Sequence, residues 1–158
     1  RIEVELAFVL GKPLSGPNCT IFDVLDATEY VVPALEILDS RIEMEGRTIV
    51  DTIADNAAMG AMVVGGRPVK VDDVDLRWIS ALLYKNQTIE ETGVAAGVLN
   101  HPAAGVYWLA NKIAAHGASL GAGEIILAGS FTRPMWVHKG DTVHADYGQL
   151  GSVTCRFE

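Results

Sequence analysis

The chain has 158 residues, enough for one domain with a sizeable core, and its 49% hydrophobic and 20% charged residues argue against a disordered protein. Its formal net charge of −8, without any basic run, argues against a nucleic-acid partner. The longest apolar runs are too short to span a bilayer and there is no secretory signal, so we expect a cytoplasmic protein with no membrane partner.

The first predicted element is a strand at residues 1–9, where charged and apolar side chains alternate. Glu3 and Glu5 fall on one face of this strand, and Ile2 and Val4 fall on the other. Two carboxylates this close repel each other unless a cation lies between them, and a hard divalent cation with oxygen ligands meets that need. The alternative is an exposed strand face with two solvated glutamates.

A turn and a helix follow. Residues 11–18 are rich in glycine and proline, which predicts a turn. Thr20 is a candidate helix cap, and Asp23 stands in the capping-box position three residues later. We expect this helix to end before Pro33, because proline disfavours a helical conformation in the residue before it.

The next predicted strand lies in the apolar stretch 31–40, which contains Glu36. An unpaired carboxylate buried among apolar neighbours is very costly, so Glu36 needs a partner there. It is interpreted either as a third metal ligand beside Glu3 and Glu5 or as a lone glutamate on the solvated face of an edge strand.

Two polar features follow that strand. Arg41 is predicted either to pair with Glu43 or Glu45 on the surface or to hold a substrate carboxylate. Asp55 and Asn56 are good capping residues for a short helix.

The middle of the chain predicts a hairpin and a helix. Residues 76–84 and 87–92 are typical of two strands joined by a tight turn, and Trp78 is interpreted as a core or subunit contact. Asn100 is predicted to cap a helix over residues 101–116.

The last third predicts a buried strand at 123–128, followed by the loop Gly129–Ser130–Phe131–Thr132 and two closing strands at 142–147 and 152–157. Backbone donors and two hydroxyls in this loop suit the binding of a carboxylate. Strands outnumber helices and most connections are short. We therefore predict a single domain over residues 1–158 of the α+β class, rich in strands, with a mixed or antiparallel sheet folded into a sandwich, roll or barrel.

The sequence resembles a known family. Residues 1–8 followed by 34–41 are similar to the fumarylacetoacetate hydrolase superfamily, within its hydratase and decarboxylase branch of aromatic meta-cleavage degradation. The likeness covers essentially the whole chain. Its most specific runs are residues 51–58, 90–102, 129–134 and 151–157.

The resemblance implies a metal site and a substrate site. The implied cation is Mg²⁺ or Mn²⁺, since oxygen-only ligands select these ions over zinc. The implied metal ligands are Glu3, Glu5 and Glu36, and the implied substrate contacts are Gly129, Ser130, Thr132 and Asn56. The family's catalytic lysine belongs to a segment that precedes the first strand in its members. The catalytic residues are therefore expected outside this chain, which we interpret as the C-terminal part of a longer protein.

The implied reaction is metal-dependent addition of water to a 2-hydroxy-2,4-dienoate, with 2-oxohept-4-ene-1,7-dioate giving 4-hydroxy-2-oxoheptanedioate. The partner is thus a small 2-oxo or 2-hydroxy dicarboxylic acid. The alternatives are decarboxylation of 4-oxalocrotonate and a non-catalytic partner subunit of such an enzyme. Members of this branch lead us to expect a homo-oligomer and association with an enzyme that acts next to it in the pathway.

Overall fold

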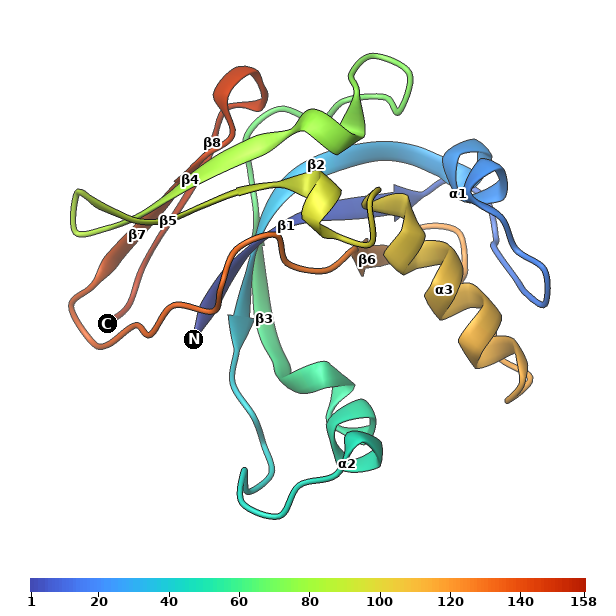
Figure 1. Cartoon of the computed structure of the whole chain (residues 1–158), viewed down its shortest axis with the longest axis horizontal. Coiled ribbons are helices and arrows are strands. Elements are labelled where there is room, and N and C mark those ends of the chain that lie inside the picture. Colours follow the sequence, from blue (N-terminus) through green and yellow to red (C-terminus); the bar gives the residue numbers. More distant parts are fainter.

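The computed structural model describes all 158 residues and shows two four-stranded sheets with helices at their edges (Figure 1). Every strand pairing is antiparallel. The first sheet has the order β3 (Met59–Val64), β2 (Thr28–Leu38), β1 (Ile2–Leu10) and β6 (Ile125–Leu127). The second has the order β5 (Thr88–Val94), β4 (Ser80–Lys85), β7 (Thr142–Asp146) and β8 (Ser152–Arg156). The predicted fold class is confirmed.

The helices are short. The three α-helices are α1 (Ile21–Ala27), α2 (Ile49–Ala54) and α3 (Ala103–Ala114). Single 3₁₀ turns occur at Asn56–Ala58, Leu76–Trp78, Ala95–Gly97 and Gly148–Leu150. None of the helices is long and apolar enough to cross a membrane.

The two faces of β1 have different roles. Val4 and Leu6 point into the main core, which they share with Leu83 and Val143 of the second sheet. The opposite face carries Glu3 and Glu5, followed by a smaller apolar cluster of Ala7, Val9, Val32 and Ala34. Because side chains alternate along a strand, burial of the even-numbered residues in the core places both glutamates on the other face.

The first helix ends before Pro33, as predicted, and the following strand begins earlier than expected. Thr20 and Asp23 form the expected capping box, but α1 ends at Ala27 and β2 begins at once with Thr28. The Thr28 hydroxyl donates to Val24 O and closes the helix. Pro33 lies inside β2, where its carbonyl accepts from Gly65 N–H at the point where β3 has ended. Proline is accommodated there because no β3 residue needs its missing N–H.

Two other boundaries also differ from the prediction. Leu76–Trp78 is a 3₁₀ turn, not the start of a strand. Trp78 is 67% exposed, so it is not in the core, and its role as a subunit contact stays a prediction. Asn100 does not cap α3, which begins at Ala103. Asn100 has a φ of 71° and its side chain accepts instead from Arg77.

Residues between β2 and β3 form a projecting segment that carries α2 (Figure 1). Thr48 caps α2 through a capping box with Asp51, and no residue of the helix is buried. Arg41 binds Asp55, so its predicted surface partners Glu43 and Glu45 are wrong. Asp55 follows the C-terminal end of α2 and does not cap its start.

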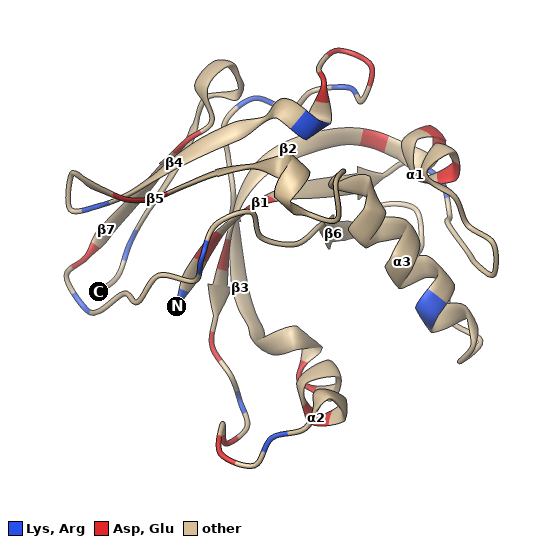
Figure 2. Ribbon diagram, in the orientation of Figure 1, with Lys and Arg blue, Asp and Glu red and all other residues tan.

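Charged residues are spread over the molecule. Figure 2 shows Lys and Arg on separate elements, while acidic residues mark α1, α2 and the centre of the first sheet. The acids at the centre of the first sheet lie on the neighbouring strands β1 and β2.

Candidate metal centre

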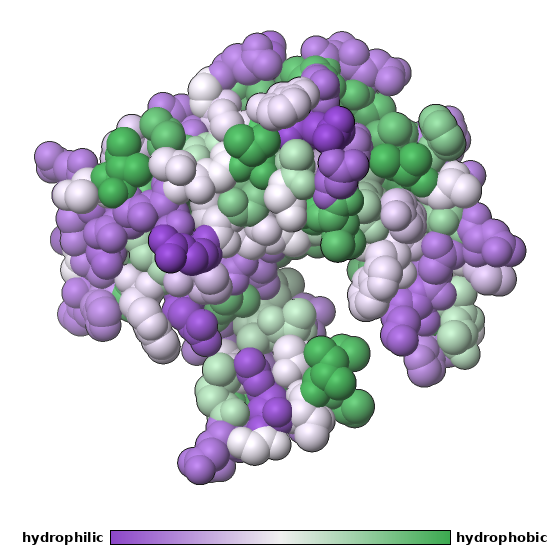
Figure 3. Space-filling model, viewed as in Figure 1, coloured by the Kyte–Doolittle hydropathy of each residue, from purple (hydrophilic) through white to green (hydrophobic).

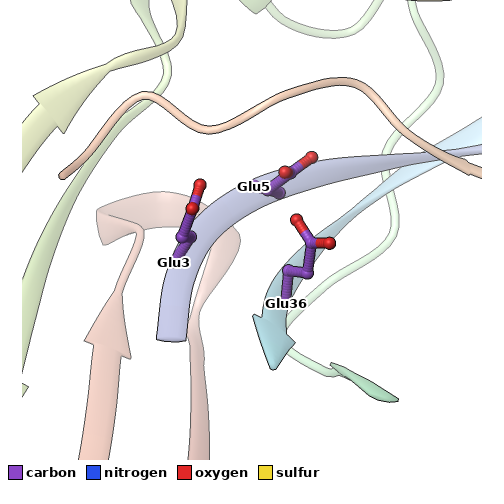
Figure 4. Close-up of side chains that lie close together, drawn as sticks. All are labelled: Glu3, Glu5 and Glu36. Atoms are coloured by element: carbon purple, nitrogen blue, oxygen red, sulfur yellow. The ribbon is translucent and has the colours of Figure 1, made fainter. Parts of the chain in front are cut away.

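Strand register brings three carboxylates together. Glu3 and Glu36 are directly opposite each other on β1 and β2, and Glu5 is two residues along β1 on the same face. One carboxylate oxygen from each residue lies within 4.8 Å of the other two. Figure 4 shows the three side chains converging from these two strands. The structure therefore brings together all three residues predicted as metal ligands.

The carboxylates are buried without a cationic partner. Glu5 and Glu36 are 3% and 8% exposed, and Glu3 is half-buried. No lysine or arginine forms an ion pair with any of them. Burial, followed by the neighbouring Glu36, raises the pKa of Glu5 to about 9. Burial also raises the pKa of Glu3, against the opposing influence of the Ser130 hydroxyl.

The loop after β6 borders this cluster. Gly129 N–H donates to Glu5 Oε2 at 2.7 Å, and this is the only backbone donor that binds the cluster. Helix α3 passes very close to the start of the loop, since a Cβ on Gly105 would stand 2.2 Å from Ala128 O. Glycine at position 105 thus allows the helix and the loop to pack against each other.

The hydroxyls of Ser130 and Thr132 hold this loop on β1. The single Ser130 hydroxyl proton has two acceptors within reach, Thr132 O at 2.8 Å and Val4 O at 3.2 Å. Thr132 Oγ1 accepts from Val4 N–H at 3.2 Å. These contacts give both hydroxyls partners within the protein.

A cavity of about 560 Å³ opens beside the carboxylates. Its mouth is the hollow that Figure 3 shows between the α2 segment and α3. Two carboxylates, Glu5 and Glu36, lie on its wall together with Gly129 and Asn56, whereas Ser130 and Thr132 do not. The remaining wall is mainly apolar and is formed by Ile53, Ala57, Met59, Met62, Trp108, Leu109, Leu120, Glu124, Ile125, Ile126 and Leu127.

Asn56 reaches the cavity through an unusual backbone. Asn56, Ala57 and Ala58 all have positive φ values, of 51°, 55° and 67°. Non-glycine residues rarely adopt this conformation, and such strain persists only where surrounding contacts hold it. Here Arg41 supplies those contacts on both sides of the turn: its guanidinium binds the carboxylate and the carbonyl of Asp55, and it donates to Met59 O.

Sequence reasoning missed two contacts near the site. Tyr147 is buried, and its hydroxyl contacts the backbone carbonyls of Glu5 on β1 and Ala34 on β2. The pair of Arg41 and Asp55 fixes one wall of the cavity. Neither contact has a local signal, since the partners are separated by up to 142 residues along the chain.

The donor set fits a hard divalent cation. Three carboxylates supply only oxygen ligands, and Mg²⁺ and Ca²⁺ are the ions that such sites favour. Two of the three carboxylates are nearly inaccessible to water, and a cation would replace the lost solvation of all three. The strand-rich fold thus places an acidic cluster suited to a divalent cation beside a largely apolar cavity.

Comparison with known proteins identifies the family. The model of the fumarylacetoacetate (FAA) hydrolase C-terminal family matches residues 1–158, and the chain belongs to this family.

Individual relatives cover the chain from end to end. It is 63% identical over 163 residues to 2-oxo-hept-4-ene-1,7-dioate hydratase of Escherichia coli, which aligns with 99% of this chain. It is 41% identical over 157 residues to 4-oxalocrotonate decarboxylase of Pseudomonas putida, again over 99% of this chain. The alignments include 61% and 60% of these relatives, so the chain spans about three fifths of their length.

A solved structure confirms the fold. The 4-oxalocrotonate decarboxylase of Pseudomonas putida G7, complexed with magnesium and adipate, superposes with a TM-score of 0.94 at 39% identity. The match covers 99% of this chain and 60% of that one. The same enzyme complexed with calcium and acetate gives a TM-score of 0.93.

Proposed function

We propose that the chain forms the metal-binding part of a Mg²⁺-dependent hydratase that adds water to a 2-hydroxy-2,4-dienoate in aromatic meta-cleavage degradation. The favoured substrate is 2-oxohept-4-ene-1,7-dioate and the product 4-hydroxy-2-oxoheptanedioate. One observation carries the proposal: a cluster of three carboxylates without a cationic partner, two of which line a cavity, occurs in a chain 63% identical to a hydratase of that dioate. Mg²⁺ is favoured over Mn²⁺ because a related structure holds magnesium.

The residues have separate roles in this proposal. Glu3, Glu5 and Glu36 would hold the cation, and Gly129 N–H keeps the Glu5 carboxylate oriented. When bound, the cation supplies Lewis-acid chemistry, which stabilises negative charge on the C2 oxygen of a 2-oxo acid. Three carboxylates leave roughly half of an octahedron for water and substrate oxygens.

The cavity walls would bind the rest of the substrate. The apolar side chains of Met59, Trp108 and Leu127 suit a conjugated carbon chain, because they exclude water from it. Asn56 and Gly129 offer polar contacts on the wall. Ser130 and Thr132 complete the proposed substrate site by holding the Gly129 loop on β1.

Decarboxylation of 4-oxalocrotonate is the second candidate. It is favoured by the TM-score of 0.94 to a decarboxylase complexed with magnesium and adipate. The same oxygen-bound cation would accept electron density from the bond to the departing carboxylate. A non-catalytic partner subunit, with the metal site retained for structure, is the third reading.

The setting of the enzyme is part of the proposal. Residues 1–158 act as one domain of a cytoplasmic homo-oligomer that can associate with an enzyme of a neighbouring pathway step. We infer that a catalytic proton donor or base comes from the part of the relatives that lies outside the region aligned with these residues.

Product analysis tests these alternatives. The protein expressed from its complete gene is incubated with 2-hydroxyhepta-2,4-dienedioate and, separately, with 4-oxalocrotonate, in Mg²⁺ and then in chelator. Mg²⁺-dependent loss of dienol absorbance without CO₂ supports the hydratase. Release of CO₂ from 4-oxalocrotonate as the faster reaction would move the assignment to the decarboxylase. Failure to turn over either acid would leave the partner-subunit reading.

A further inference from the structure

Tyr147 contacts the sheet at the level of the glutamates. Its side chain is 3% exposed, and its hydroxyl lies 2.9 Å from Glu5 O and 2.5 Å from Ala34 O. Glu5 and Ala34 are directly opposite each other on β1 and β2. One hydroxyl proton is therefore offered to a carbonyl of each strand that carries a metal ligand.

The two carbonyls belong to the ladder between β1 and β2. At the next pair along the strands, Leu6 O accepts from Ala128 N–H and Pro33 O accepts from Gly65 N–H. The carbonyls of Leu6 and Pro33 therefore point away from the β1–β2 ladder. Carbonyl directions alternate along antiparallel strands. The carbonyls of Glu5 and Ala34 consequently point towards the opposite strand, and the tyrosine hydroxyl lies over the junction from the core side.

The tyrosine is held in place by its own loop. Tyr147 N–H donates to Gly151 O at 2.9 Å, and Arg67 N–H, which follows β3, donates to Leu150 O at 2.6 Å. The ring packs edge-on against Phe131, with ring centroids 6.3 Å apart. The hydroxyl position is thus fixed by the second sheet and by the Gly129–Thr132 loop together.

We propose that Tyr147 is a positioning residue that sets the spacing of β1 and β2 and thereby fits the Glu3, Glu5 and Glu36 carboxylates to Mg²⁺. The inference rests on the metal site of the proposed function. Mg²⁺ demands near-ideal octahedral geometry, with bonds of about 2.0–2.1 Å, whereas Ca²⁺ accepts about 2.3–2.6 Å and irregular coordination. A looser strand pair would therefore weaken Mg²⁺ binding more than Ca²⁺ binding.

The test is calorimetric titration of Mg²⁺ and Ca²⁺ into the complete protein and its Tyr147→Phe variant. Residues that support metal ligands typically change affinity 10–100-fold when altered, so we expect about a tenfold loss for Mg²⁺. The loss for Ca²⁺ should be about threefold or less, because its coordination is more tolerant. The ratio of the two affinities is a readout that general destabilisation does not move.

The matched control is Thr28→Val. This change also removes one buried hydroxyl from the first sheet, where it donates to Val24 O at 2.7 Å, far from the carboxylates along β2. The control should lower thermal stability and leave the Mg²⁺ to Ca²⁺ ratio unchanged. If Tyr147→Phe fails to fold, Phe131→Leu loosens the same ring and should shift the ratio in the same direction.

The outcomes distinguish the positioning role of Tyr147 from the proposed metal site. Mg²⁺ binding by the wild-type protein with an unchanged ratio in the tyrosine variant, or in Phe131→Leu where that replaces it, would overturn the positioning role alone. Absence of Mg²⁺ binding to the wild-type protein would overturn the metal site and, with it, the positioning role.

Discussion

Glu5 and Asp55 are both buried acids, but their surroundings shift their pKa values in opposite directions. Asp55 is 7% exposed and its carboxylate accepts from the Ser40 hydroxyl, the Arg41 backbone and the Arg41 guanidinium. Burial alone would raise its pKa, yet the hydrogen bonds and charge of Arg41 hold the pKa of Asp55 below its ordinary value. Glu5 has one backbone donor, two acidic neighbours and a pKa raised to about 9.

The difference separates a structural acid from a functional one. Asp55 has its countercharge within the chain, and the pair serves to fix the turn that precedes β3. Glu5, Glu3 and Glu36 have no internal countercharge, so the fold keeps three acids in a costly arrangement that a bound cation would relieve.

The largest expected effect comes from Glu5→Gln. Loss of a direct ligand should weaken Mg²⁺ binding by more than about 100-fold, beyond the 10–100-fold typical of supporting residues. The same change should raise the melting temperature of the metal-free protein at neutral pH, because glutamine is neutral without the proton uptake that the raised pKa of Glu5 requires on folding. Calorimetric titration and thermal melts in chelator measure the two effects. Unchanged Mg²⁺ affinity in both Glu5→Gln and Glu36→Gln would refute the site.

Arg41→Ala should lower the melting temperature and change Mg²⁺ affinity little, the reverse of Glu5→Gln. It leaves the carboxylate of Asp55 buried without its cation, so we expect a melting temperature lower by several degrees. Mg²⁺ affinity should change much less than in Glu5→Gln, because the three glutamates lie on β1 and β2 and Arg41 lies outside both strands. Thermal melts of Arg41→Ala and of the double variant Arg41→Ala/Asp55→Asn provide the comparison. Recovery of stability in the double variant is expected, and its absence would mean that the guanidinium acts mainly through the backbone carbonyls of Asp55 and Met59.

The two acids also predict opposite dependences on pH. The folded pKa of Glu5, about 9, lies above the ordinary value of 4.5, so its contribution to stability is greatest below about pH 4.5 and is lost as pH rises towards 9. Asp55 has a lowered pKa, so its contribution is present above the ordinary value of 3.8 and is lost as pH falls through the folded value.

Denaturation in chelator from pH 5 to pH 9 measures the first effect. Wild-type stability should fall with pH relative to Glu5→Gln, which lacks the titrating group. Mg²⁺ should reverse this trend, and its binding at pH 7 should release about one proton because ligands bind in the charged form. Parallel curves for the two proteins would contradict the raised pKa of Glu5.

The smallest effect should come from an exposed ion pair. Lys12 and Asp26 lie 2.8 Å apart with side chains 61% and 75% exposed. Such pairs contribute roughly 0–1 kcal/mol, since water and salt screen the charges. Lys12→Ala should therefore leave Mg²⁺ affinity and melting temperature nearly unchanged, which makes it a baseline for the buried acids. A melting temperature as low as that of Arg41→Ala would show that burial does not set the order of these effects.

The sequence predicts the carboxylate cluster better than the surrounding walls. Alternation in β1 and the apolar setting of Glu36 are local patterns, and they led to the carboxylates that the fold brings together. Strand β2 begins earlier than predicted because β-branched residues from Thr28 onward favour a strand over the helix that could have continued. The partners of Arg41 and Tyr147 depend on contacts between distant segments, which no local pattern encodes.

The most direct test of the metal site is anomalous diffraction from crystals of the complete protein grown with Mn²⁺ in place of Mg²⁺. We predict one strong anomalous peak per chain, bonded to carboxylate oxygens of Glu3, Glu5 and Glu36 and open to the cavity on its other side. A peak at other residues, or no peak at these three under saturating Mn²⁺, would contradict the account.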